Sequence, residues 1–177
     1  MPELPEVEAM RRGPGERALG RRIALVDLRE AGLLHGAAAD DLSAALEGRA
    51  LGALRRHGKV LFARADDGPW LVMHFGMTGF LAAYGDESGE PEHARLVLAF
   101  ADGGFLAWDC QRKFGWLELA DDPEAYVRAQ GLGPDALAIG EDAFDALLCG
   151  TRGMVKPALM DQEKIAGIGN VWSDEIL

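Results

Sequence analysis

Three residues at the start of the sequence could carry out chemistry together: Pro2, Glu3 and Glu6. If Met1 is removed, Pro2 presents a secondary amine, part of which is neutral and nucleophilic at physiological pH. Such an amine adds to an aldehyde-level carbon and forms an iminium that has no N–H proton to lose, so the adduct stays cationic and favours elimination at the neighbouring carbon. Glu3 could protonate a ring or leaving-group oxygen. The same residues also suit an ordinary helix start.

The first element that must position these residues is a helix. Leu4, Val7 and Met10 recur every three residues and predict one helical face, while Gly13-Pro14 predicts the end of the helix. A strand over residues 23–30, a short helix over 40–46 and a strand pair over 50–63 are expected next.

The middle of the sequence is dense in strand-forming residues. The stretch WLVMHFGMTGFLAAY (70–84) predicts a hairpin whose glycine-flanked tip carries Met77. Asp102-Gly103-Gly104 predicts a second hairpin between two apolar runs. Asp121-Asp122-Pro123 and GLGPDAL (131–137) are typical of a linker, and helices are expected over 141–148, 155–161 and from 170 onward. The sequence therefore predicts an α+β protein, with a two-layer β-sandwich and flanking helices over residues 1–130 and a linker with helices over 131–177.

Composition narrows the class of protein. The 177 residues are 49% hydrophobic and 27% charged, with no apolar run near the roughly 20 residues of a membrane span and no positive segment that would start a secretory signal. A globular, cytoplasmic protein is expected. Cys110 and Cys149 lie far apart, which argues against a disulfide framework or a cysteine zinc site and predicts that both are buried. The net charge of -11 argues against a nucleic-acid partner unless basic residues cluster on one face or in segments beyond Leu177.

Six short stretches then occur in one order along the chain. They are PELPEVE (2–8), RRHGKVLF (55–62), MHFGMTG (73–79), RKFG (112–115), GLGPDAL (131–137) and KPALMDQEKIAGIGNVWSDEIL (156–177). Together they resemble the formamidopyrimidine-DNA glycosylase and endonuclease VIII family of base-excision repair enzymes. The first and last stretches are highly specific, whereas RKFG alone is weak. PELPEVE resembles the formamidopyrimidine branch more than the endonuclease VIII branch, which usually has glycine at the position of Leu4.

The resemblance implies a bifunctional DNA glycosylase and abasic-site lyase that removes oxidised purines (8-oxoguanine, formamidopyrimidines) through an iminium on Pro2. It makes Pro2 the nucleophile on the sugar C1′, Glu3 the general acid and Lys59 a contact to the phosphate that flanks the lesion. It also assigns Glu6 and His74 to the lesion pocket. Taken singly, Lys59 could be a solvated hairpin lysine and His74 an ordinary sheet histidine.

The resemblance also implies a DNA-binding surface. A glycosylase must flip its target nucleotide by about 180°, and Met77, Arg112 and Phe114 would enter the gap that the extruded base leaves. Lys156, Gly169 and Asn170 would bind the DNA backbone, the last two in a turn before a helix. The plain alternative for Met77 and Phe114 is a place in the core. The implied partner is double-stranded DNA with a damaged base or abasic site. A monomer is expected, and no membrane partner is expected.

The sequence departs from the family pattern in three ways. Family members continue for about another hundred residues, well within domain lengths, so this chain is expected to end inside the first helix of a helix-two-turn-helix domain. The family's zinc would bind in that further part, and no metal-ligand set or other cofactor is expected within these residues. The stretch DCQRKFG lacks the proline that commonly follows Asp109, and Lys113 stands where arginine is frequent. An attached Met1 would make the Pro2 nitrogen an amide and remove the nucleophile.

Three alternatives stay open on the sequence. The first is an endonuclease VIII-like glycosylase for oxidised pyrimidines. The second is a non-catalytic fragment that binds damaged DNA or another protein. The third is a tautomerase in which Pro2 acts as a base on a small keto acid, a function that would leave Lys59, Met77 and Phe114 without a role.

Overall fold

The computed structural model describes residues 1–85, 89–151 and 153–177. Within these ranges the strands form a four-stranded sheet in the order β1-β7-β8-β6 and a five-stranded sheet in the order β2-β9-β5-β4-β3. The strands are β1 (Ile23–Leu28), β2 (Leu34–His35), β3 (Leu51–His57), β4 (Val60–Ala65), β5 (Trp70–His74), β6 (Phe80–Tyr84), β7 (Ala94–Phe100), β8 (Phe105–Asp109) and β9 (Trp116–Ala120).

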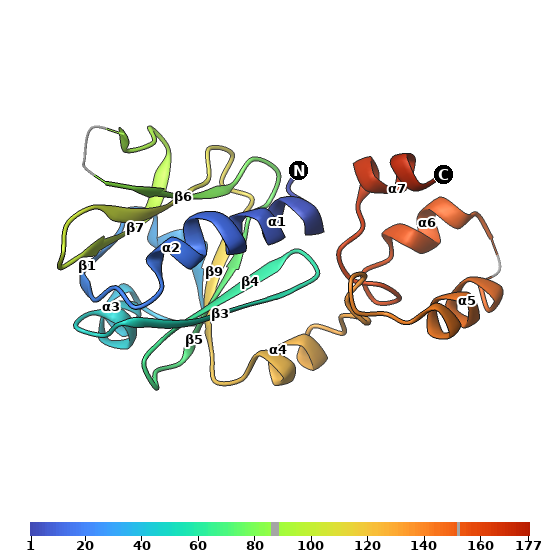
Figure 1. The fold of residues 1–177 in the computed structure, drawn as a ribbon, viewed down its shortest axis with the longest axis horizontal. Coiled ribbons are helices and arrows are strands. Elements are labelled where there is room, and N and C mark those ends of the chain that lie inside the picture. The colour runs from blue at the N-terminus through green and yellow to red at the C-terminus, as the bar shows by residue number, and fades with distance from the viewer. Residues whose placement is uncertain (86–88, 152) are drawn as a thin grey trace.

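The longer helices divide between two parts of the molecule. In Figure 1, α1 and α3 lie with the sheets, α5, α6 and α7 form a separate group, and α4 lies on the connection between the two parts. The N-terminus lies on the side of the β-rich part that faces the helical group. The α-helices are α1 (Leu4–Met10), α2 (Glu16–Ala18), α3 (Ala39–Leu46), α4 (Pro123–Ala129), α5 (Glu141–Cys149), α6 (Val155–Met160) and α7 (Asn170–Ile176), and a 3-10 turn covers Ala31–Leu33.

The two sheets share one hydrophobic core, and strand β4 shows how the sequence produces it. Successive side chains of a strand point to opposite faces. Leu61 and Ala63 enter the core between the sheets, whereas Phe62 packs on the other face against Tyr126 of α4. The five-stranded sheet is therefore covered on both faces, which holds the β3–β4 hairpin firmly. The predicted α+β architecture, two sheets with flanking helices, is confirmed.

The N-terminal helix continues beyond its predicted end. After α1 the chain enters a π-helical turn (Arg11–Gly15) and then α2, so Pro14 lies inside a helix. Proline lacks an N–H and its ring crowds the carbonyl of the preceding turn. The wider turn accommodates both, since the Glu16 N–H donates to the carbonyl of Arg11 five residues back. The prediction that Gly13-Pro14 ends the helix was wrong.

The stretch 70–84 is not a hairpin. Strand β5 belongs to the five-stranded sheet and β6 to the four-stranded sheet, so the turn between them crosses from one layer to the other. Alternation and glycine content predict two strands and a turn but do not tell which partners the strands choose. The predictions of a tight turn at Gly76 and Gly79 and of Met77 at its tip are correct.

The other two predicted strand pairs are confirmed. Strands β3 and β4 pair antiparallel up to His57 opposite Val60, which leaves Gly58 and Lys59 at the tip. Strands β7 and β8 pair antiparallel around a turn in which Gly103 and Gly104 have φ of 93° and 67°. Only glycine adopts such angles readily, which explains why this turn could be predicted.

The helices after residue 120 agree with those predicted from the sequence, except for α4. Residues 121–123 were predicted as linker, but Pro123 begins α4 and the Asp122 carboxylate accepts a hydrogen bond from the Ala125 N–H at 2.7 Å. An aspartate N-cap followed by proline is a helix-start signal that the linker interpretation overlooked. Helix α4 ends next to the boundary predicted at residue 130, which stays a prediction. Cys110 is buried as expected, but Cys149 is exposed, so that prediction was wrong.

Residues 1–85, 89–151 and 153–177 lack two features. None of their helices combines the length and apolar character needed to cross a bilayer. No group of three or more His, Cys, Asp or Glu side chains in those ranges is arranged to hold a metal ion.

Candidate active site

Glu3 joins the N-terminus of α1 to the N-terminus of α7. Its side chain is buried (1% exposed), and its carboxylate accepts backbone hydrogen bonds from Gly169 at 2.6 Å, Val171 at 2.9 Å and Trp172 at 3.3 Å. These N–H groups are among the first of α7, which have no partner inside the helix. A carboxylate buried at this point is therefore fully hydrogen-bonded, and residues from opposite ends of the chain fix its position.

Two glycines allow this approach. A Cβ on Gly169 would clash with the Glu3 carboxyl group, and a Cβ on Gly167 would clash with the Leu4 side chain. Gly167 also has a φ of 123°, which side-chain-bearing residues rarely adopt, and its carbonyl accepts the Leu4 N–H at 3.1 Å. The sequence predicted a phosphate-binding role for this turn but not its close contact with the N-terminus.

Glu6 and Pro2 surround the same point. The Glu6 carboxylate accepts the Glu3 backbone N–H at 2.9 Å and the indole N–H of Trp172 at 3.3 Å. Glu6 is otherwise exposed and Pro2 is half-buried, directly before Glu3. The amine of a chain that begins at Pro2 would therefore lie one residue from a buried carboxylate and close to an exposed one.

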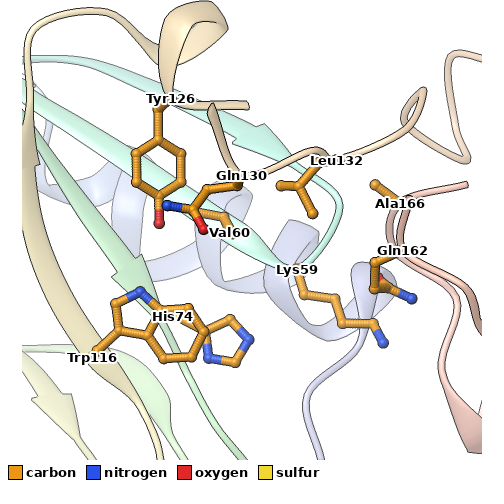
Figure 2. A pocket seen from close by; sticks show the side chains of 9 residues that line it. All are labelled: Lys59, Val60, His74, Trp116, Tyr126, Gln130, Leu132, Gln162 and Ala166. Carbon is orange, nitrogen blue, oxygen red and sulfur yellow. The ribbon is translucent and has the colours of Figure 1, made fainter. Parts of the chain in front are cut away.

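Lys59 and His74 line one cavity of about 200 Å³ (Figure 2). Its other lining residues are Val60, Trp116, Tyr126, Gln130, Leu132, Gln162 and Ala166. Partial burial lowers the pKa of Lys59, and the attraction of the Glu3 carboxylate acts in the opposite direction. Lys59 is thus a half-buried cation within electrostatic reach of Glu3, and the alternative of a fully solvated hairpin lysine does not fit.

His74 is held as a neutral imidazole. Burial, followed by repulsion from Lys59, lowers its pKa to about 4. Its ring stacks on Trp116 with centroids 3.7 Å apart and an 18° angle between the planes. The Gly76 N–H donates to Nδ1 at 3.1 Å, so the single proton of the neutral ring belongs on Nε2. His74 therefore offers a hydrogen-bond donor beside the Lys59 ammonium.

Met77, Arg112 and Phe114, predicted to fill the gap in the DNA, come together in space. A Cβ on Gly76 would clash with the backbone of Phe114, so the two turns pack main chain against main chain. The Arg112 N–H also donates to the Thr78 hydroxyl at 3.3 Å. Met77 and Phe114 are 43% and 55% exposed, which rules out a place for either in the core.

The loop that carries Phe114 has two further supports. The Arg112 guanidinium carbon lies 5.0 Å from the centre of the Phe114 ring, a cation–π distance. Lys113 has a φ of 54°, in the left-handed region, and its ammonium pairs with Glu30. The lysine that departs from the family pattern thus ties the loop to the β-sandwich.

The three residues predicted to bind the DNA backbone have different surroundings. Asn170 is exposed as the first residue of α7, and Gly169 is buried against Glu3. Lys156 lies on α6, and its ammonium pairs with Asp174 of α7. The structure therefore gives Lys156 a structural contact in addition to its predicted role.

Sequence reasoning missed Gln162. Its side-chain amide donates to the carbonyls of Met160 and Ile168, both at 2.7 Å, and its oxygen accepts the Gly167 N–H at 3.0 Å. Gln162 thereby closes the loop that presents Gly167 and Gly169 to the N-terminus. It lies within the most specific of the quoted stretches, but nothing in its type or spacing marked it as a loop organiser.

Comparison with known proteins identifies the family of this chain. Residues 1–117 match the family model described as the formamidopyrimidine-DNA glycosylase N-terminal domain. The whole chain is 39% identical to the formamidopyrimidine-DNA glycosylase of Solibacter usitatus and 37% identical to that of Salinispora arenicola, covering 64% of each relative. The chain thus spans slightly less than two thirds of these relatives. It belongs to the formamidopyrimidine-DNA glycosylase family.

Solved structures extend the likeness to the whole described fold. The chain is similar to the formamidopyrimidine-DNA glycosylase of Lactococcus lactis bound to DNA that contains an AP site, with a TM-score of 0.88, 30% identity, and coverage of 99% of this chain and 67% of that one. It is equally similar, at 29% identity, to MutM in complex with DNA that contains carbocyclic 8-oxo-G. The expected relationship is confirmed by both sequence and fold.

Proposed function

We propose that this protein is a bifunctional DNA glycosylase and abasic-site lyase of base-excision repair that removes oxidised purines. The observation that carries the proposal is that buried Glu3, which directly follows Pro2, lies within electrostatic reach of half-buried Lys59, while Met77 and Phe114 are exposed on two turns that pack together. One group of residues could attack and protonate a sugar, while the other could occupy the space of a flipped base. Relatives named for this activity and relatives solved with damaged DNA support it.

The proposed reaction begins at the Pro2 nitrogen of a mature chain that starts at Pro2. Its lone pair forms a bond to C1′ of the damaged nucleotide as the bond from C1′ to the base breaks, and the base leaves with the bonding electrons and is protonated by water. The Glu3 carboxylate takes the N–H proton of the attached proline and passes it to the ring oxygen O4′, and the C1′–O4′ bond breaks to leave an iminium. The resulting iminium withdraws electrons, so loss of a C2′ proton expels the 3′ phosphate, and a second elimination expels the 5′ phosphate. Lys59 binds the phosphate next to the lesion, and Glu6 and the Nε2–H of His74 belong to the lesion pocket.

The DNA would be held by residues from both parts of the molecule. Met77 and Phe114 fill the gap in the stack, and Arg112 hydrogen-bonds the base that has lost its partner. Asn170 and the backbone at Gly169 contact phosphates at the start of α7. Lys156 would join them if DNA draws it from Asp174. We expect the protein to act as a monomer in the cytoplasm.

The solved structures of relatives support oxidised purines over oxidised pyrimidines as the substrate of this protein. One is a complex with DNA that contains carbocyclic 8-oxo-G, and two are complexes with DNA that contains N7-benzyl-Fapy-dG. Parallel excision assays on duplexes that contain 8-oxoguanine or thymine glycol test this choice. Faster release of 8-oxoguanine by the whole natural polypeptide is expected. Preferential release of thymine glycol would establish the endonuclease VIII-like alternative instead, and binding without release of either base would leave the non-catalytic one.

A further inference from the structure

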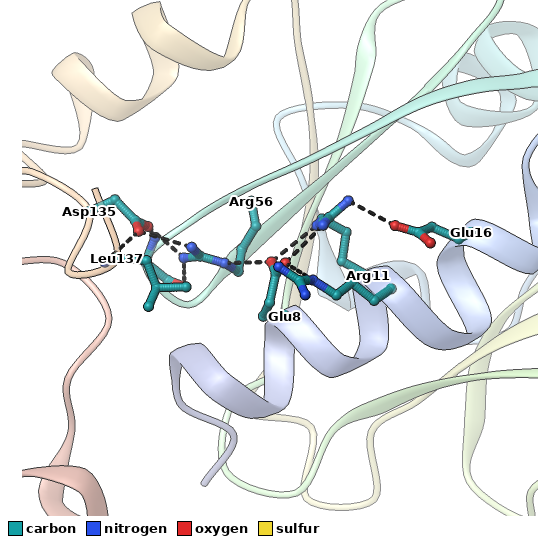
Figure 3. Close-up of polar contacts among 8 residues, drawn as sticks. Glu8, Arg11, Glu16, Arg56, Asp135 and Leu137 are labelled. Atoms are coloured by element: carbon teal, nitrogen blue, oxygen red, sulfur yellow. Dashed lines mark hydrogen bonds and ion pairs between the residues drawn. The ribbon is translucent and has the colours of Figure 1, made fainter.

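A network of buried charges links the two parts of the molecule near the candidate site. Arg56 lies on β3, three residues before Lys59, and its side chain is 7% exposed. Its guanidinium donates to both oxygens of Asp135, at 2.5 and 2.9 Å, and its Nε donates to Glu8 at 3.1 Å. Figure 3 shows Arg56 between Asp135 on one side and Glu8 of α1 on the other.

Asp135 also binds the hairpin tip directly. Its carboxylate accepts the Gly58 N–H at 2.7 Å and the Leu137 N–H at 3.0 Å, while Arg56 donates to the Gly58 carbonyl at 2.9 Å. Burial alone would raise the pKa of Asp135, but the hydrogen bonds from Arg56 and Gly58 lower it overall. Gly58, which precedes Lys59, is therefore held through both its N–H and its carbonyl by one ion pair.

The segment around Asp135 continues this connection to the Glu3 site. Ala136 donates to the Ala166 carbonyl and Ala166 donates to the Pro134 carbonyl, both at 2.9 Å. Ala166 directly precedes the Gly167–Asn170 turn that presents its N–H groups to Glu3. Gly58 leaves no spare room, because a Cβ there would lie 2.9 Å from the Ala166 Cβ. Two short chains of contacts thus connect Arg56 to Lys59 and to the Glu3 carboxylate.

We propose that Arg56, through Asp135, is a positioning residue that holds the Lys59 tip and the Gly167–Asn170 turn in one arrangement around Pro2 and Glu3. We expect it not to contact DNA, because its guanidinium is buried and four of its five N–H donors bind Asp135, Glu8 and the Gly58 carbonyl. The role rests on the proposed function, since Lys59 and Glu3 are reactive-site residues only if that function holds. A bidentate pair suits this role, because the planar guanidinium fixes direction as well as charge.

The test variant is Arg56→Lys in the whole natural polypeptide, because it keeps the positive charge beside Asp135 but cannot hold Asp135, Glu8 and the Gly58 carbonyl together. Arg55→Lys is the matched control, since Arg55 is exposed on the neighbouring position of β3 and pairs with Glu124. The rate of borohydride trapping on abasic-site duplex is measured at saturating protein, and DNA affinity is measured separately. A misplacement of about 1 Å can cost about 100-fold in rate, so Arg56→Lys is expected to slow trapping at saturating protein by roughly tenfold or more, and by more than it weakens DNA binding, whereas Arg55→Lys should trap at the wild-type rate.

A second variant separates positioning from a general loss of stability. The same substitution is therefore also made in a Lys59→Met protein. If Arg56 acts through Lys59, Arg56→Lys should slow trapping by a smaller factor in the Lys59→Met protein than in the wild type. If the two residues act independently, the factors by which the two single substitutions slow trapping should multiply in the double variant. Trapping by Arg56→Lys at the wild-type rate, or full multiplication of the two effects, would overturn the proposal.

Amide hydrogen exchange keeps the failure of this inference distinct from the failure of the proposed function. Arg56→Lys, unlike Arg55→Lys, should speed exchange of the Gly58 and Gly169 N–H groups, which bind Asp135 and Glu3. Normal wild-type trapping with unchanged exchange and rate in Arg56→Lys refutes the positioning role alone. If the wild-type protein forms no adduct, the proposed function is refuted, and so is any effect of Arg56 on catalysis. Hydrogen exchange then decides whether Arg56 still couples the Lys59 tip to the Gly167–Asn170 turn.

Discussion

The Glu3–Lys59 region and the Met77–Phe114 region face opposite physical demands. Glu3 is buried and every oxygen of its carboxylate is hydrogen-bonded, while Met77 and Phe114 leave about half of their apolar side chains in water. Groups that act on a sugar must be held in place before the substrate arrives. Groups that fill a gap in DNA need a firm backbone and free, apolar ends. Under the proposed function, the first region is completed within the protein, and we expect the second to be completed only when DNA binds.

The largest expected effect comes from the internally completed region. Glu3→Gln keeps the shape of the side chain but removes the acid and replaces one acceptor by a donor that faces the α7 N–H groups. Because acid–base catalysis contributes about 10²–10⁴-fold, 8-oxoguanine release measured in single-turnover assays should fall by at least about 100-fold. Glu16→Gln, an exposed change on α2, is the control. Release at the wild-type rate by Glu3→Gln would show that the buried carboxylate is purely structural.

The pH dependence of stability tests the surroundings of His74 in the same region. Its pKa is about 4 in the folded protein against an ordinary 6.5, so the unfolded chain binds the additional proton between these values. Stability is therefore complete above pH 6.5 and falls by about 3 kcal/mol as the pH drops to 4. Urea unfolding of wild type and His74→Phe across this range measures the effect, and the variant should lose this part of the slope. Equal slopes would mean that His74 is not held neutral.

Phe114→Ala tests the region that DNA completes. Stacking of an aromatic side chain on bases is worth about 1–3 kcal/mol, so affinity for duplex with an abasic site should fall by roughly 5- to 150-fold. The free energy of unfolding should change by less than about 0.5 kcal/mol, because the ring is exposed. Leu25→Ala removes an equally exposed apolar side chain from β1 and should change neither quantity. A large loss of stability in Phe114→Ala would contradict the comparison.

Lys59 gives the smallest expected effect on binding. Removing one phosphate contact with Lys59→Met should reduce the salt slope of DNA binding by about 0.9. Burial lowers the pKa of Lys59, so its ammonium loses its proton at a lower pH than that of an exposed lysine. The contribution of Lys59 to DNA affinity should therefore begin to fall at a lower alkaline pH than the contribution of an exposed lysine. Arg17→Met, an exposed change on α2, should leave the slope unaltered. An unchanged slope in Lys59→Met would remove the phosphate contact from the account.

Local features of the sequence predicted much of this arrangement. The spacing of Leu4, Val7 and Met10 gave the buried helical face, and the turn glycines gave the tips that carry Lys59 and Met77. The resemblance to a known family supplied the roles of Pro2 and Glu3, which spacing alone left open.

Long-range partners could not be predicted from the sequence. Arg56 and Asp135 are 79 residues apart, and neither residue type reveals its partner. The strands β5 and β6 have the pattern of a hairpin, yet β5 pairs with β4 and β9 while β6 pairs with β8, and side chains of both strands enter the core between the two sheets. Contacts of this kind depend on the whole fold and not on local propensity.

The central claim is that the Pro2 nitrogen captures the sugar. The most direct measurement is mass spectrometry of the borohydride-trapped complex between the mature natural protein and abasic-site duplex, followed by digestion and sequencing of the modified peptide. The account predicts one adduct, on the nitrogen of Pro2 in a chain that has lost Met1. An adduct on Lys59 or another lysine, or efficient trapping by a chain that retains Met1, would contradict it.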